Sequence, residues 1–133
     1  LGLRNSNLGA EGAAALAALH SAPALEDLHL DLAGNKIGAD GAEALACLFR
    51  APQLQKLHLE LRGNHIGDAA VGQLTEWTVA PSLHSLHLGL GRNGITEMGA
   101  CHLVRLKACS SLQTLHLDLR GNVITDCGAQ ALA

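Results

Sequence analysis

Apolar and polar residues alternate over five positions at four places along the chain. Leucine occupies every second position from Leu28 to Leu32, and His29 and Asp31 lie between the leucines. A period of two is typical of a β-strand with one buried face, so the leucines are expected to face a core and His29 and Asp31 to face outward. The same pattern begins again at Leu57, Leu86 and Leu115.

A turn and then a helical pattern follow each strand pattern. After Leu32, residues 33–36 are expected to turn the chain and Ile37 to return to the core. Residues 39–50 carry apolar side chains at helical spacing, and Pro52 is expected to stop the helix. The core-facing helix positions predicted along the chain are Ala13, Leu16, Ala42, Leu45, Leu48, Val71, Leu74, Trp77, Ala100, Leu103, Leu106, Ala129 and Leu132.

Two further features concern the helices. Glycine recurs where helix and sheet are expected to approach closely, at Gly12, Gly41, Gly99 and Gly128, with Ala70 in the remaining copy. Thr96 before Glu97 and Thr125 before Asp126 suit helix starts, because a hydroxyl can cap the first turn and an acid there favours the helix dipole.

The whole unit repeats, since Leu28, Leu57, Leu86 and Leu115 lie 29 residues apart. A fixed period of this size is the signature of a solenoid, in which each unit buries its apolar side only against its neighbours. Strand, turn, helix and strand in series predict parallel strands joined by right-handed crossovers. We therefore expect a single α/β solenoid over residues 1–133, built as a partial first repeat (1–27), full repeats (28–56, 57–85 and 86–114) and a truncated last repeat (115–133). Neither end resembles a polar cap, which suits a segment of a longer array.

An asparagine recurs in the turn of each repeat. These residues are Asn35, Asn64, Asn93 and Asn122. An inward asparagine at each turn can satisfy backbone groups that a continuous spiral leaves unpaired, so we interpret the four as a structural spine. Ser6 takes this slot in the first repeat, and the pattern leaves open whether Asn5 or Asn7 substitutes for it.

The motif is most complete from Leu30 to Leu45, which reads Leu-x-Leu-x-x-Asn-x-Ile-Gly-x-x-Gly-Ala-x-x-Leu. It resembles a leucine-rich repeat of the ribonuclease-inhibitor type, and the resemblance covers essentially the whole chain. Such a family implies a horseshoe with parallel strands on the concave side, helices on the convex side and protein-binding activity. The spacing from Leu25 to Asn35 is two residues longer than in the usual motif, which predicts longer strands.

Equivalent outward residues are expected to form rows, because neighbouring strands lie about 4.8 Å apart. The rows are a histidine ladder (His29, His58, His87 and His116), a mostly acidic row (Asp31, Glu60, Gly89 and Asp118) and a partly basic row (Arg4, Ala33, Arg62, Gly91 and Arg120). The concave residues expected to bind a partner are His29, Asp31, His58, Glu60, Arg62, His87, Gly89, Gly91, His116, Asp118 and Arg120.

The histidine ladder admits three interpretations. Neighbouring imidazoles lower one another's pKa and the acids beside them raise it, so a pH-responsive surface is one hypothesis whose sign the pattern leaves open. A metal site is a weaker one, because zinc needs three or four convergent ligands and a flat ladder presents parallel ones. Duplication of one ancestral histidine along a solvated face is the simplest interpretation.

The repeat that opens at Leu86 departs from the others, because Gly89 and Gly91 take both outward slots after the ladder histidine. Sequence drift in one repeat explains this most simply. The alternative is a notch that receives a bulky group of a partner, since glycine in a strand often marks a close approach.

Composition removes several classes of function. The net charge is −3 and no basic run is present, which disfavours nucleic acid. No apolar run approaches the length of a membrane span, about 20 residues. Four scattered cysteines, Cys47, Cys101, Cys109 and Cys127, suit free thiols in a reducing compartment. We therefore expect an intracellular protein, cytosolic or organellar, with a targeting segment before residue 1 left open.

Catalytic motifs are weak. Residues 89–94 match G-x-G-x-x-G, but the other repeats carry different residues in the same slots, and Asn93 belongs to the spine. No serine has the context of a nucleophile elbow. We expect no enzyme activity, cofactor or resident metal. The favoured hypothesis is a non-catalytic module that binds a protein partner on its concave sheet face. The alternative is an accessory structural subunit of a larger assembly that docks through its uncapped ends or convex helices.

Overall fold

The computed structural model describes residues 1–76 and 82–133. Trp77 lies outside these residues, so its predicted core position stays a prediction. The strands are β1 (Asp27–Asp31), β2 (Lys56–Glu60), β3 (Ser85–Gly89) and β4 (Thr114–Asp118). The α-helices are α1 (Gly9–Ala17), α2 (Gly38–Leu45), α3 (Gly67–Leu74), α4 (Glu97–Leu103) and α5 (Asp126–Leu132), and 3₁₀ turns follow at Ala18–Ser21, Ala46–Arg50 and Val104–Ala108.

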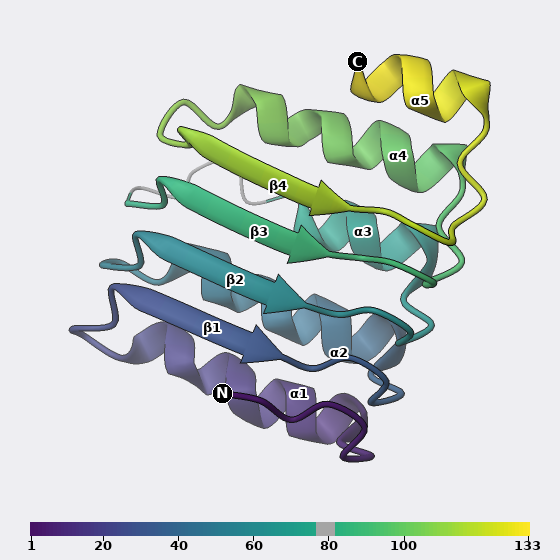
Figure 1. Cartoon of the computed structure of the whole chain (residues 1–133). Helices are drawn as coiled ribbons and strands as arrows, with labels where there is room; N and C mark the ends of the chain where they lie inside the picture. The colour runs from purple at the N-terminus through teal and green to yellow at the C-terminus, as the bar shows by residue number, and fades with distance from the viewer. Residues whose placement is uncertain (77–81) are drawn as a thin grey trace.

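The four strands form one parallel sheet in the order β1-β2-β3-β4. They pair in one common register, so that Leu28 lies beside Leu57 and His29 beside His58. Figure 1 shows the strands side by side, the helices on one face of the sheet and the opposite face open. This arrangement confirms the predicted α/β solenoid of parallel strands that alternate with helices.

Leucine side chains from every coil build the core between sheet and helices. Leu30, Leu59 and Leu88 are each at most 1% exposed, and burial of one leucine side chain stabilises the fold by about 2 kcal/mol. In the last described coil, Leu115 is 39% exposed. No described strand follows β4, so the outer side of this leucine lacks the neighbour that covers its counterparts.

The predicted helix over residues 39–50 is divided. The α-helix ends at Leu45, and a 3₁₀ turn (Ala46–Arg50) completes the segment. A 3₁₀ turn tightens the chain and uses i to i+3 hydrogen bonds, as is frequent at the end of an α-helix. Ala51 then becomes extended with φ −59° and ψ 126°, which is the conformation favoured before a proline such as Pro52.

The recurrent helix glycines serve a different contact from the one predicted. A Cβ atom at Gly41 would lie 3.0 Å from Cα of Ala10, in the helix of the preceding repeat. A Cβ atom at Gly128 would likewise lie 3.2 Å from Cβ of Ala100. The close approach is therefore between consecutive helices and not between helix and sheet. The prediction was wrong because helices of successive repeats also pack against one another, and a glycine there leaves room for the backbone of the preceding helix.

The turn asparagines bind the preceding coil through both ends of the amide. Oδ1 of Asn64 accepts hydrogen bonds from the N–H groups of Asn35 (2.8 Å) and Ile37 (3.3 Å). Its Nδ2 donates to the carbonyls of Leu32 and Leu61, at 2.9 Å each. All these groups are buried, so the amide replaces water that cannot reach them.

The backbone N–H of Ser6, which takes the asparagine position of the first repeat, is hydrogen-bonded by the asparagine of the next repeat. Oδ1 of Asn35 accepts from the Ser6 N–H at 2.8 Å, as Asn64 does for Asn35. Asn5 and Asn7 are exposed and have φ values of 55° and 52°. They occupy left-handed turn positions, which asparagine tolerates, and neither takes the place of a spine amide.

The two predicted threonine caps differ. Thr96 is the N-cap of α4, and its Oγ1 accepts a hydrogen bond from the Met98 N–H at 3.3 Å. Thr125 precedes α5 but makes no side-chain cap, and its hydroxyl donates to the Glu97 carboxylate at 2.7 Å. The second cap was predicted wrongly because capping depends on how the hydroxyl oxygen is oriented toward the first turn, which the residue type alone does not specify.

Candidate functional site

The histidine ladder is a continuous stack of imidazole rings on the open face of the sheet. Ring centroids are 3.9 Å apart between His29 and His58 and between His58 and His87, and 4.4 Å apart between His87 and His116. Neighbouring rings are tilted by 11° or less. The common register of the parallel strands holds the rings in this order, because it places each histidine beside the next.

The inner two rings favour the neutral form. Partial burial lowers the pKa of His58 and His87, and neighbouring ladder imidazoles lower it further. Asp31 raises the pKa of His58, and Glu60 raises that of His87, but these effects are smaller in sum. The structure thus indicates that the pKa of these two histidines is lowered, a direction that the sequence pattern left open.

At both ends of the sheet, the acidic row is neutralised within the chain. Nε of Arg4 lies 3.3 Å from Oδ2 of Asp31. The guanidinium of Arg120 binds Asp118 with two contacts, Nη2–Oδ2 at 2.6 Å and Nε–Oδ1 at 2.9 Å. Hydrogen bonds from the side chain and backbone of Arg120 hold the pKa of Asp118 far below its usual range.

The middle of the face differs, because side chains of the repeat before it cover Gly89 and Gly91. The Glu60 carboxylate lies over Gly89, in the space that a side chain would take, and its Oε1 accepts the Arg62 N–H at 3.0 Å. The Arg62 side chain lies over Gly91, where a Cβ would be 3.5 Å from Arg62 Cγ. Both glycines are buried, so the open notch expected from the sequence is filled, and a partner group entering it would displace Glu60.

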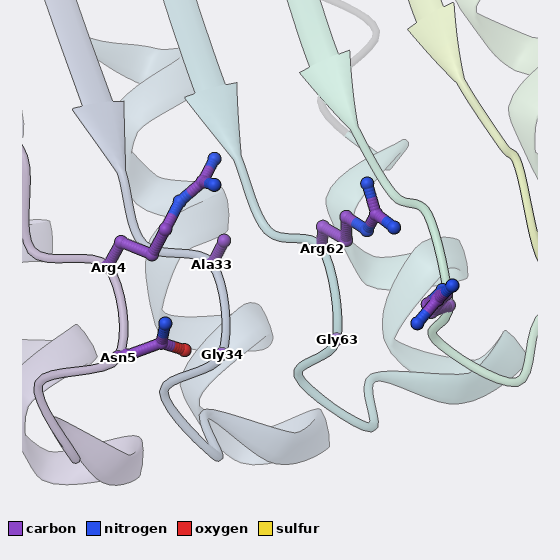
Figure 2. A pocket seen from close by; sticks show the side chains of 7 residues that line it. Arg4, Asn5, Ala33, Gly34, Arg62 and Gly63 are labelled. Atoms are coloured by element: carbon purple, nitrogen blue, oxygen red, sulfur yellow. The ribbon is translucent and has the colours of Figure 1, made fainter.

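Ala33 is also buried, although its row was expected to face outward. Figure 2 shows that the Arg4 side chain points across the end of the first strand toward Ala33. Long side chains of this row therefore cover the small residues of the next repeat.

A hollow of about 240 Å³ lies at the turns that follow the strands. Figure 2 shows three successive turns side by side there, carrying Arg4 with Asn5, Ala33 with Gly34 and Arg62 with Gly63. Arg92 completes the lining. Sequence reasoning missed Asn5, Gly34, Gly63 and Arg92 as site residues. The available signal was the order Gly91-Arg92, which reverses Arg62-Gly63 of the repeat before.

Other kinds of site have less support. Within residues 1–76 and 82–133, no group of three or more histidine, cysteine, aspartate or glutamate residues could hold a metal ion. No described helix is both long enough and apolar enough to cross a membrane. All four cysteines are free thiols, and Cys109 is the buried one among them.

Comparison with known proteins places the repeat pattern in a described family. A family model described as "Leucine Rich repeat" matches residues 28–46, 54–72 and 108–133. Leucine-rich repeats generally mediate protein–protein interaction. No curated protein matches the chain. Gly89, Gly91 and Arg92 fall between the matched stretches, in the repeat whose face departs from the others. The chain therefore contains leucine-rich repeats, folded as parallel strands that alternate with helices.

Proposed function

We propose that this protein is a non-catalytic interaction module that binds a protein partner on the open face of its sheet. The proposal includes the ribonuclease-inhibitor-like repeat type that the motif resembles, in which this face is concave. The observation that carries it is the stacked histidine ladder, which lies on the face that the helices leave uncovered (Figure 1).

The histidine side chains of the ladder are already ordered, which supports their use in binding a partner. The rings already stack on regular strands, so a partner that binds them orders few additional side chains, and ordering costs about 0.5–1.5 kcal/mol for each flexible side chain. The imidazole nitrogens can donate or accept hydrogen bonds at the ring edges, because stacking covers the ring faces between neighbours. A standard interface needs about 800 Å² on each partner, a size that suits several adjacent strands together.

The test is affinity capture with a matched pair of variants. His58→Gln/His87→Gln alters the middle of the ladder and keeps hydrogen-bonding side chains there. Met98→Ala alters α4 on the helix side, where Met98 is 60% exposed. Captured proteins are identified by mass spectrometry, and their affinities are then measured by calorimetry with purified partner.

We expect the histidine variant to lose the partner and Met98→Ala to retain it. Circular dichroism and urea unfolding establish that both variants fold. Capture of the same partner with equal affinity by the histidine variant contradicts binding on the open face. Loss of the partner with Met98→Ala instead supports the alternative, docking through the helices.

A further inference from the structure

Four arginines lie near the ends of the strands, and two of them are neutralised within the chain. Arg4 pairs with Asp31, and Arg120 pairs with Asp118. No described residue forms an ion pair with the guanidinium groups of Arg62 or Arg92. These two cations line the hollow together with Arg4.

The glycine at position 89 explains why Arg62 is unpaired. In the last repeat, Asp118 binds the guanidinium of Arg120, two residues later. Glu60 is the equivalent acid for Arg62, but its carboxylate lies over Gly89 and accepts only the Arg62 backbone N–H. The missing side chain at Gly89 thus gives Glu60 a place away from the guanidinium. Arg62 still lowers the pKa of Asp118, which is a longer-range effect without an ion pair.

Arg92 reaches the hollow through a strained backbone position. Its φ is 53°, in the left-handed region, whereas Gly34, Gly63 and Gly121 take this slot in other repeats. A side chain in this conformation costs about 1–2 kcal/mol. The exchange of order to Gly91-Arg92 moves the arginine from the strand end to the turn. Arg92 also has no acidic residue two or three positions before it, because Gly89 takes the position that belongs to the acidic row.

The hollow has room for a ligand above Gly63, whereas the Asn5 side chain lies over Gly34. A Cβ atom at Gly63 would meet no other atom within 4 Å. Figure 2 shows Gly63 and Gly34 on adjacent turns, with Arg4 and Arg62 on the strand side of them. Guanidinium groups are planar forks that bind carboxylates through two parallel hydrogen bonds, and they need no proton exchange to do so.

We propose that this hollow binds carboxylates of an acidic segment of the protein partner. The chain itself favours carboxylate as the anion, because the two paired arginines of the same edge bind aspartates. The inference rests on the proposed function, since Arg62 belongs to the surface assigned to the partner, and it names the chemistry of that partner.

The test is fluorescence anisotropy with three labelled peptides of equal length: hexaglutamate, hexalysine and a peptide whose only charged side chain is one phosphoserine. Arg92→Gly removes one cation and inserts the glycine that other repeats carry, so its folding is expected to be intact. The control, Arg105→Gln, removes the same charge from an exposed position in the 3₁₀ turn Val104–Ala108. The double variant Gly91→Arg/Arg92→Gly restores the usual order without changing net charge.

We expect hexaglutamate to bind the natural protein and hexalysine not to bind it. Arg92→Gly and the double variant are expected to weaken binding about tenfold, as for the loss of one charged hydrogen bond, and Arg105→Gln to leave it nearly unchanged. Equal affinities of Arg92→Gly and Arg105→Gln overturn the inference. Binding of the phosphoserine peptide without binding of hexaglutamate overturns the choice of carboxylate.

The histidine variant separates this inference from the proposed function. If hexaglutamate binding depends on Arg92 while His58→Gln/His87→Gln still captures the partner, the open-face function fails and the anion hollow stands. If capture requires the histidines while Arg92→Gly binds hexaglutamate normally, the hollow fails and the open-face function stands.

Discussion

Asp68 accepts two hydrogen bonds from Thr96, a residue of the next repeat. Oδ1 accepts the Thr96 N–H at 2.8 Å, and Oδ2 accepts the Thr96 hydroxyl at 2.7 Å. Oδ1 also accepts the Gly99 N–H at 3.0 Å, so a carboxylate on α3 satisfies free N–H groups at the start of α4. Consecutive coils are therefore joined on the helix side by a side-chain cap, as the asparagines join them at the turns.

Asp68→Asn is expected to destabilise the fold by about 1–2 kcal/mol at neutral pH, because the charged cap is lost. Urea unfolding measures the change. Glu97→Gln is the matched control, since the Glu97 carboxylate is exposed and accepts one hydroxyl at the corresponding place in the next repeat; its effect is expected to stay within about 0.5 kcal/mol. Equal losses in the two variants contradict the assigned role of Asp68.

The Asp68 contribution depends on pH with a defined sign. Partial burial raises the pKa of Asp68, but hydrogen bonds from Thr96 and Gly99 outweigh it and lower the pKa below its ordinary value. A lowered native pKa stabilises the fold above the unfolded value, about 3.9, and this stability is lost as the pH falls through the native pKa. The difference in unfolding free energy between natural protein and Asp68→Asn is therefore expected to shrink below about pH 4. A difference that grows on acidification contradicts this.

Asn64→Ala is expected to cost more stability than Asn122→Ala. The change at Asn64 leaves two buried N–H groups unpaired, and each unpaired buried group costs about 1–3 kcal/mol before relaxation. The carbonyls of Leu32 and Leu61 each lose one hydrogen bond and keep another from a neighbouring spine asparagine. Asn122 makes the same contacts but is only half-buried, so water replaces part of them. Urea unfolding of the two variants compares them directly, and a larger loss at Asn122 would falsify the water argument.

The inner ladder histidines are expected to titrate below 6.5, the ordinary value for histidine. His87→Gln should raise the pKa of His58, because it removes one of the neighbouring imidazoles that lower it. Nuclear magnetic resonance of the ring C–H signals measures this. The matched variant His65→Gln removes a histidine outside the ladder and should leave the pKa of His58 unchanged. Equal shifts in both variants would show that ring stacking has no electrostatic effect.

Stability is expected to follow the same titration. A lowered native pKa favours the neutral ring, so the contribution is complete above about pH 6.5 and decreases as the pH falls from there through the native pKa values of His58 and His87. Unfolding free energies measured between pH 8 and pH 5 should fall more in the natural protein than in His58→Gln/His87→Gln. An equal fall in both proteins contradicts the assignment.

Gly89→Asp restores the acid that other repeats carry, yet it is expected to be less stable than Gly89→Asn. Each new side chain must displace the Glu60 carboxylate, but aspartate also places a like charge between Glu60 and Asp118 on adjacent strands. The difference should be about 0.2–1 kcal/mol and should decrease with salt, since exposed charges are screened. Urea unfolding at low and high ionic strength measures it, and a difference independent of salt excludes repulsion as its cause.

The sequence by itself determined the solenoid and its rows. Alternating leucines specify which side of each strand is buried, and a constant period places equivalent residues side by side once parallel strands pair in register. The histidine ladder, the acidic row and the asparagine slots follow from that spacing, because each depends on position along a regular backbone and not on how a side chain is oriented.

Only the tertiary structure decided the contacts that side chains make across coils. Glu60 covers Gly89, Asp68 caps the helix at Thr96, and Arg92 reaches the hollow with Arg62. Each contact depends on which of several groups in the adjacent repeat a flexible side chain binds. The local sequence pattern does not specify that partner. Side-chain orientation likewise decided that Thr96 caps its helix and Thr125 does not, although the hydroxyls of both donate to a carboxylate of the preceding repeat.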